Sequence, residues 1–422
     1  MRKTYNIRDV RSDFAVAIRR HNKVNKTRLI KFFAIIFFIF IVIILISGIF
    51  SARLYAFADD GAELSESITS IIDGLDLSEI EEYLEKYGNE YIFSFGDSAR
   101  EIVEFFVSGD LGLNYGDYIG KILSVFFKGV ISLIPAFAQI VAISILCAIC
   151  TGVEGGIISK TTAKTIRLAG LSLIILILAS MLLSIISSAT QSIARIQKQV
   201  EIITPILITL TVLTGGSASG AIYQPSALFL STGAIEIVTG LIFPATIAVV
   251  LLTFMSKLNP EISFTGVSSL VKSIMKWVIG LTVAIFGLFI TVQGSASSLF
   301  NGIFFKVTKY LVGNSVPIVG NFLSAGVDMV VMAGSLVRSS VGVLGIILLL
   351  SEIIQPVLLL AAFSVMLKIC AAIVQPLGEK VSFSLFSELS KDIEFFIAGI
   401  LMVAFMYLLV VMLIINSAGS FI

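Results

Sequence analysis

Two glutamates inside strongly apolar sequence are the residues of this chain best suited to a chemical role. Glu236 lies in the sequence GAIEIVTG and Glu352 in LLLSEIIQP. An ionisable side chain is costly in a bilayer and, where it occurs, commonly marks an ion or substrate pathway. Both carboxylates are therefore candidate intramembrane functional groups for carrying protons or binding cations. The competing interpretation is structural, with Glu352 at a helix break, Glu236 near a membrane boundary, and each of them solvated or paired.

The cysteines and the single histidine do not form a recognisable catalytic or metal-binding pattern. Cys147 and Cys150 have CxxC spacing, but they lie in the apolar run ISILCAIC, where thiols act as small packing groups. Cys370 also lies in a hydrophobic stretch, and His21 alone cannot build a histidine-based metal site or a catalytic triad. The sequence has no P-loop, nucleophile elbow, HExxH motif or glycine-rich dinucleotide turn. We therefore expect no catalytic residue, no bound metal and no cofactor.

The composition places these residues in a bilayer. Of the 422 residues, 57% are hydrophobic and only 14% are charged, which leaves too little polar surface for a soluble chain of this length. Several uncharged stretches reach the roughly 20 residues that a helix needs to cross the hydrocarbon core. We predict an all-α, polytopic membrane protein with an N-terminal signal or anchor and a short extracytoplasmic amphipathic helical segment. Nucleic-acid binding is not expected, because the basic head lacks the fold signatures for it.

The net charge reverses across the first hydrophobic run. Met1–Lys31 contains ten Lys/Arg and two Asp/Glu, Phe32–Phe50 is uncharged, and Asp59–Gly120 contains sixteen Asp/Glu against two Lys/Arg. Because basic flanks stay in the cytoplasm, the acidic segment should lie outside it. Ala56-Phe57-Ala58 has the form of a signal-peptidase site, and both cleavage after Ala58 and retention as an anchor agree with that side. The predicted domains are the basic head with signal peptide or anchor (1–58), the acidic extracytoplasmic helical segment (59–120) and the polytopic membrane domain (121–422).

The acidic segment has the pattern of short amphipathic helices. Leu77, Ile80, Tyr83 and Leu84 recur at helical spacing, and Ser78 and Glu81 have the spacing of a capping box, which predicts a helix start at Ser78. About 60 residues barely make an independent core. We therefore expect the segment to pack on the membrane domain or on a partner, with a solvated acidic linker as the alternative.

The membrane domain shows interruptions, so we predict about six to eight spans with broken or re-entrant helices. Gln191–Glu201 reads as a polar connector, and Ile202–Leu213 as a half-length segment that ends in a glycine-rich cluster. Val341–Val374 is too long for one simple span, and Pro356 in its middle predicts a kinked helix or a tight hairpin. The glycines of the cluster suit close helix packing or the lining of a pore. These candidate positions are Gly215, Gly216 and Gly220.

Several short motifs follow one another in a definite order through the C-terminal half. They are LVGNSVPIVG at 311–320, AGVD at 325–328, SLVR at 335–338, VGVLG at 341–345 and AAIVQPLG at 371–378. Together with LDLSEI at 75–80, this order resembles stage III sporulation protein AE, a family of polytopic membrane proteins of endospore-forming Firmicutes. The resemblance covers residues 60–422, and the long basic head departs from it. The candidate structural motif positions are Gly313, Pro317, Gly320, Asp328, Gln375, Pro376 and Gly378.

The resemblance implies a non-enzymatic membrane subunit of an eight-protein mother-cell assembly that meets a forespore membrane protein across the intermembrane space. That assembly is expected to form a channel, or feeding tube, that sustains late forespore gene expression. The implied location is the mother-cell membrane surrounding the forespore. The implied partners are membrane lipid and the other stage III channel-complex proteins, in an oligomeric assembly. Two alternatives stay open: an ion-coupled secondary transporter that uses Glu236 or Glu352, and a non-conducting membrane scaffold.

Overall fold

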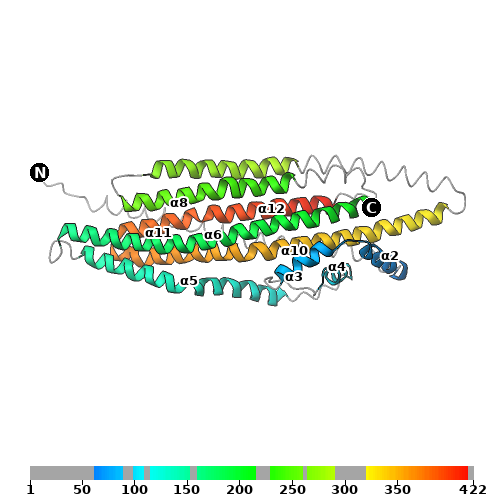
Figure 1. Ribbon diagram of the computed structural model, residues 1–422, viewed down its shortest axis with the longest axis horizontal. Coiled ribbons are helices and arrows are strands. Elements are labelled where there is room, and N and C mark those ends of the chain that lie inside the picture. Colours follow the sequence, from blue (N-terminus) through cyan, green and yellow to red (C-terminus); the bar gives the residue numbers. More distant parts are fainter. Residues whose placement is uncertain are drawn as a thin grey trace, which may run out of the picture. The chain divides into compact units, whose positions relative to one another are not determined.

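The described part of the chain is helical throughout. The computed structural model describes residues 61–88, 98–108, 115–152, 159–214, 229–259, 264–289 and 320–416. The predictions for the basic head and for the site after Ala58 lie outside these residues. The described helices belong to one compact unit, Ala62–Ile422 (Figure 1). The residues described contain no strand, which confirms the predicted all-α fold.

Six helices within the described ranges are long and apolar enough to cross a bilayer, so the chain is a multi-pass membrane protein. A helix suits hydrocarbon because its backbone donors and acceptors pair with one another where no water can reach them. Several side-chain hydroxyls are satisfied in the same way, as Ser144 and Thr211 donate to the carbonyl oxygens four residues earlier. The six candidate spans are Gly120–Cys150, Thr161–Leu213, Phe229–Leu258, Thr265–Phe289, Met329–Leu377 and Lys380–Ile415.

Two helices are far longer than a bilayer is thick. α6 (Lys160–Leu213) has 54 residues and α10 (Gly320–Val374) has 55, so each is about 80 Å long at 1.5 Å per residue. The hydrocarbon core measures only about 30 Å. Both helices must therefore project well beyond it. The expected connector at Gln191–Glu201 and the separate half-length segment that follows it are wrong, because both belong to the uninterrupted α6.

α10 occupies the centre of the unit. It packs against α4 (Ala99–Ser108), α5 (Tyr115–Gly152), α6, α11 (Lys380–Asp392) and α12 (Glu394–Asn416) (Figure 1). Nearly every residue from 337 to 354 is buried, as expected of a helix that is apolar on all sides. The alternative of a hairpin around Pro356 is wrong, because this proline lies inside a single helix.

A proline also lies within the span Phe229–Leu258, where the sequence suggests an interruption. The structure accommodates it with the π-helical turn η2 (Val238–Ile242), which is followed directly by α8 (Phe243–Leu258). Pro244 is the second residue of α8, and the backbone N–H of Phe243 donates to Val238 five residues earlier. Proline lacks an N–H and clashes with a regular preceding turn, so the wider turn lets the helix continue past it.

Three short helices precede the membrane helices: α2 (Gly61–Asp73), α3 (Ser78–Tyr87) and α4. α3 begins at Ser78 as the sequence predicts, but the capping box does not form. Instead, the Asp76 carboxylate accepts hydrogen bonds from the backbone N–H and the hydroxyl of Ser78, and these bonds lower the pKa of Asp76. A carboxylate near the first turn also interacts favourably with the helix dipole.

Glycines permit the close approach of α12 to α10. A Cβ atom added at Gly342 would collide with the Ile415 side chain, and one added at Gly345 would lie 2.9 Å from the Tyr407 hydroxyl oxygen. Both glycines are inside α10 and face α12. Small residues let helix backbones approach and gain dispersion contacts in a setting where the hydrophobic effect does not drive helices together.

Replacing Gly342 should loosen this contact. We expect Gly342→Leu to lower the free energy of unfolding by about 1–3 kcal/mol through overpacking, measured as a reduced thermal midpoint of the detergent-solubilised protein. Gly280→Leu is the matched control, because a Cβ atom at Gly280 meets nothing within 4 Å. Equal midpoints for the two variants would contradict the assigned packing.

Candidate functional site: buried polar contacts at three levels of the bundle

A buried polar junction links α3 to the two long helices. The Tyr83 hydroxyl of α3 donates to Glu352 Oε1 of α10 at 3.1 Å and accepts from Gln199 Nε2 of α6 at 2.9 Å. All three side chains are buried. The junction therefore satisfies polar groups that would otherwise be costly between apolar helices.

Arg195 completes this junction from α6. Its Nε lies 3.6 Å from Glu352 Oε2, and its guanidinium lies 5.0 Å from the centre of the Tyr87 ring. Arg195 and Gln199 are four residues apart on α6, as Tyr83 and Tyr87 are on α3. Since residues four apart share one helix face, two matched pairs face each other across the α3–α6 contact. We call Tyr83, Tyr87, Arg195, Gln199 and Glu352 the outer junction.

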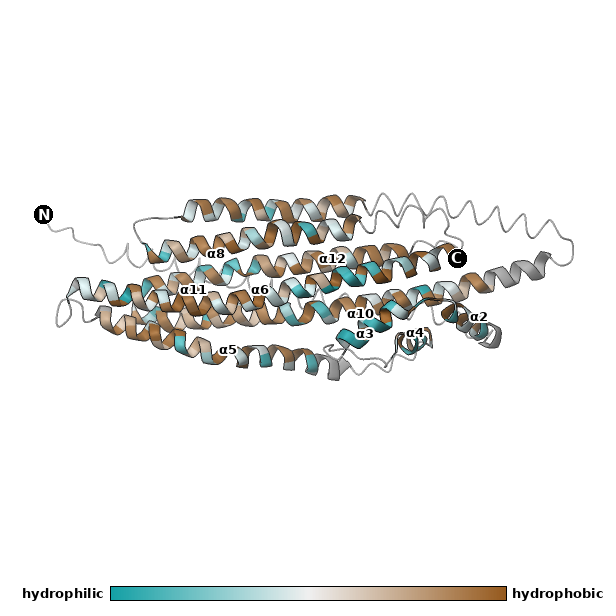
Figure 2. Cartoon of the chain, viewed as in Figure 1, coloured by the Kyte–Doolittle hydropathy of each residue, from teal (hydrophilic) through white to brown (hydrophobic). Residues whose placement is uncertain are grey.

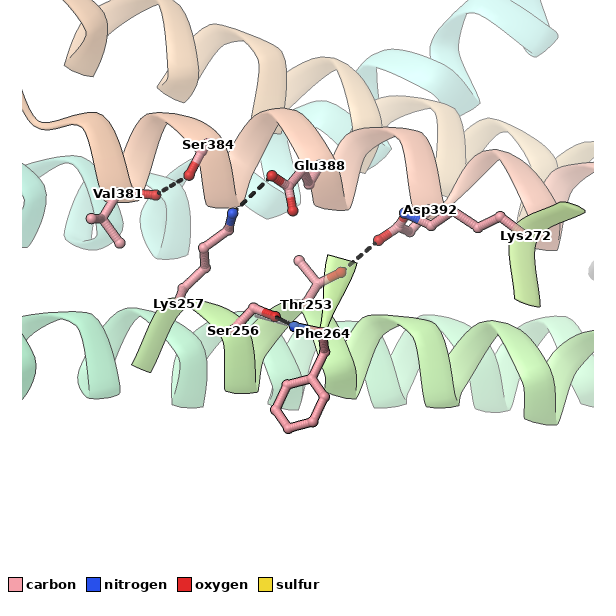
Figure 3. Close-up of polar contacts among 9 residues, drawn as sticks. All are labelled: Thr253, Ser256, Lys257, Phe264, Lys272, Val381, Ser384, Glu388 and Asp392. Atoms are coloured by element: carbon pink, nitrogen blue, oxygen red, sulfur yellow. Dashed lines mark hydrogen bonds and ion pairs between the residues drawn. The ribbon is translucent and has the colours of Figure 1, made fainter. Parts of the chain in front are cut away.

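Two ion pairs join α11 to the hairpin that contains α8 and the helix Thr265–Phe289. Lys272 Nζ lies 2.6 Å from Asp392 Oδ1, and the Thr253 hydroxyl donates to Asp392 Oδ2 at 3.0 Å (Figure 3). Lys257 Nζ donates to Glu388 Oε1 at 2.7 Å. Asp392 is fully buried, whereas Lys272 is about a quarter exposed. The two carboxylates are one helical turn apart on α11, so both face the hairpin.

A further ion pair lies at the end of the bundle where α6 begins, which we call the basic end because Lys160, Lys164 and Arg167 lie there. Arg167 near the start of α6 lies 3.1 Å from the buried carboxylate of Glu379, which precedes α11. About 42 Å of α6 separates Arg167 from Arg195 of the outer junction at 1.5 Å per residue. That length exceeds the hydrocarbon thickness of about 30 Å. The outer junction and the basic end therefore cannot both lie within the hydrocarbon.

The exposed face of α3 indicates where water lies. It carries four glutamates and follows the exposed Asp76, and Figure 2 shows α3 as mostly hydrophilic. Carboxylates on a lipid-facing surface would be very costly. The outer junction therefore lies beside an aqueous surface, beneath α3. The four glutamates are Glu79, Glu81, Glu82 and Glu85.

The structure separates the two glutamates that the sequence singles out. Glu352 is 4% exposed and belongs to the outer junction. Glu236 is exposed and lies in the span Phe229–Leu258. The two carboxylates do not form one site, so a single ion-binding centre made by both is not supported by this geometry.

The structure describes only some of the motif positions that the sequence predicts. Gln375 and Pro376 form the exposed 3-10 turn η3 (Gln375–Leu377), and Gly378 follows it with φ of 78°. Only glycine adopts that left-handed conformation at little cost, so this turn connects α10 to α11. Gly320 begins α10, and the backbone of Asp328 continues it. The remaining candidates, Gly215, Gly216, Gly220, Gly313 and Pro317, lie outside the described residues.

Sequence reasoning missed most of the polar contacts. Tyr83 appears in the sequence as one member of an apolar stripe, and Arg195 and Gln199 appear as parts of a connector. Their four-residue spacing is the signal that could have placed them on one helix face. Among the described residues, no group of three or more His, Cys, Asp or Glu side chains could hold a metal ion. The polar groups present can position helices by hydrogen bonds and ion pairs.

The fold and these contacts define a multi-pass helical membrane protein with three short helices packed beside its long ones. The sequence profile described as stage III sporulation protein AE matches residues 98–418. Stage III sporulation protein AE of Bacillus subtilis (strain 168) is 24% identical over 363 residues, which cover 86% of this chain and 91% of that protein. No solved structure matches the chain. The chain belongs to the stage III sporulation protein AE family.

The Lys272–Asp392 pair yields a stability prediction. Lys272→Met leaves the Asp392 carboxylate buried without its cation, which should lower the free energy of unfolding by about 3 kcal/mol. The double variant Lys272→Met/Asp392→Leu should recover most of that loss, because no buried charge remains. Thermal unfolding in detergent measures both effects, with Lys276→Met, at an exposed position, as the control. A double variant that is less stable than Lys272→Met would refute this account.

Proposed function

We propose that the chain is a membrane subunit of the channel complex that connects mother cell and forespore during sporulation. Membership of the stage III sporulation protein AE family supports a role in sporulation. The observation that carries the finer proposal is the length of α6 and α10, which join the membrane helices to the extramembrane helices α2–α4 without a break. Such helices can fix an extramembrane platform at a set distance from the bilayer.

The orientation follows from the distribution of charge. Lys160, Lys164 and Arg167 lie near the start of α6, and Arg167 is paired at the basic end of the bundle. By the positive-inside rule that end faces the mother-cell cytoplasm. The acidic α3 then faces the space between the two membranes. Its exposed carboxylates suit contact with other stage III channel-complex proteins, and assembly into an oligomer would place several such surfaces side by side.

A non-conducting scaffold is the second candidate. The observation in its favour is that Glu352 is engaged by both Tyr83 and Arg195, whereas a coupling carboxylate must exchange partners during transport. The ion-coupled transporter requires a carboxylate that is free to do so, and Glu236 is the exposed candidate. The channel subunit and the scaffold share the same membrane body and differ in whether a solute passes along it.

A clean deletion in the bacterium that encodes the chain tests the proposal. We expect engulfment to finish, a late forespore-specific reporter to stay dark, and the forespore to shrink, because supply from the mother cell is lost. Microscopy and reporter fluorescence measure these outcomes, and restoring the wild-type gene is the control. Normal spores and a normal reporter signal would refute the role in sporulation.

Substitution of Glu236 separates the proposal from the transporter. We expect Glu236→Gln to sporulate like the wild type, because its exposed side chain takes no part in the described interhelical contacts. Spore counts after heat treatment measure the effect, with protein levels checked in membrane fractions. A loss of sporulation at normal protein level would instead favour ion-coupled transport.

A further inference from the structure

The contact that holds α3 on the long helices is small. Within α3, Ile80 and Tyr83 are the buried residues, and the opposite face carries exposed carboxylates. A helix of 10 residues is not stable alone in water, so its structure depends on docking. Docking in turn depends largely on the hydroxyl of Tyr83, the apolar side chain of Ile80 and the contact of Tyr87 with Arg195.

A small void lies beneath α3, where this helix meets the two long helices. It is too narrow to admit a water molecule. The lining residues are Ile80, Tyr83, Gln199, Ile202, Ile203 and Leu348.

Two buried polar atoms beside this void have no hydrogen-bond partner among the described residues: Gln199 Oε1 and the Tyr407 hydroxyl. Ile203, which lines the void, and the Tyr407 hydroxyl both lie against the position of Gly345. A buried polar atom without a partner costs free energy that contact with water would remove. The docked arrangement therefore carries a penalty that undocking of α3 relieves, at least at Gln199.

We infer that α3 is a latch, by which we mean a helix that docks reversibly across the α6–α10 contact. The hydrogen bonds of the Tyr83 hydroxyl hold it in the docked position. When docked, α3 covers Glu352, Gln199 and Leu348. When released, it uncovers these side chains to the water that bathes its acidic face. Low local stability of this kind is typical of elements that move in conformational switching. The inference concerns contacts within the chain and does not depend on the channel complex.

Cysteine accessibility tests the latch in the full-length protein in nanodiscs. Single cysteines at Leu348 and at Ile346 are placed in a background in which Cys147, Cys150 and Cys370 are replaced, and are reacted with a membrane-impermeant maleimide. Leu348 lines the void, whereas Ile346 is equally buried at the same depth on the opposite side of α10. We expect Leu348→Cys to react faster than Ile346→Cys, and Tyr83→Phe to raise the Leu348→Cys rate about tenfold through two lost hydrogen bonds.

The control for Tyr83→Phe is Glu82→Gln, a change on the exposed face of the same helix that should leave both rates unchanged. Equal rates at the two cysteines in the parent protein would overturn the latch. So would a parallel rise at Ile346→Cys in the Tyr83→Phe variant, because that result would mean general loosening of α10. A selective rise at Leu348→Cys supports release of α3.

Discussion

The packing of α10 is the constraint on which the rest of the described structure depends. This helix is buried on all sides over its middle third and contacts α4, α5, α6, α11 and α12. Its glycines allow that crowding, since a Cβ atom at Gly334 would lie 2.7 Å from the Thr214 side chain, and those at Gly342 and Gly345 would meet α12. Any change that thickens α10 displaces helices on several sides at once.

Apolar helices in a bilayer have little to fix how far one slides along another, because lipid tails are as apolar as the helix faces. The buried polar contacts fix this axial position of one helix against another. Glu352, Glu379 and Asp392 are each buried and pair with Arg195, Arg167 and Lys272 on other helices. A buried ion pair contributes little net stability, yet breaking one is costly. These pairs therefore select one axial alignment of the helices rather than adding much to its stability.

Sequence patterns predict the helical membrane class and the start of α3 at Ser78, because hydrophobic runs and local spacing are properties of neighbouring residues. They fail at Gln191–Glu201, where polar residues form part of a helix that runs beyond the bilayer. A polar stretch between apolar ones has the same composition whether it is a loop or a projecting helix. The role of Tyr83 could not be predicted, since its partners Gln199 and Glu352 are distant in the sequence.

The same contacts bear on how α3 is coupled to the membrane helices. Tyr83 touches α6 and α10 together, and α10 continues as one helix to the turn at Gly378 that leads into α11. At the far end, α11 holds the α8 hairpin through Lys257 and Lys272. The contact of α3 with the long helices is much smaller than the contact between α6 and α10, so force applied to α3 from the aqueous side would first break the hydrogen bonds of Tyr83, before it displaced α10 or the ion pairs on α11.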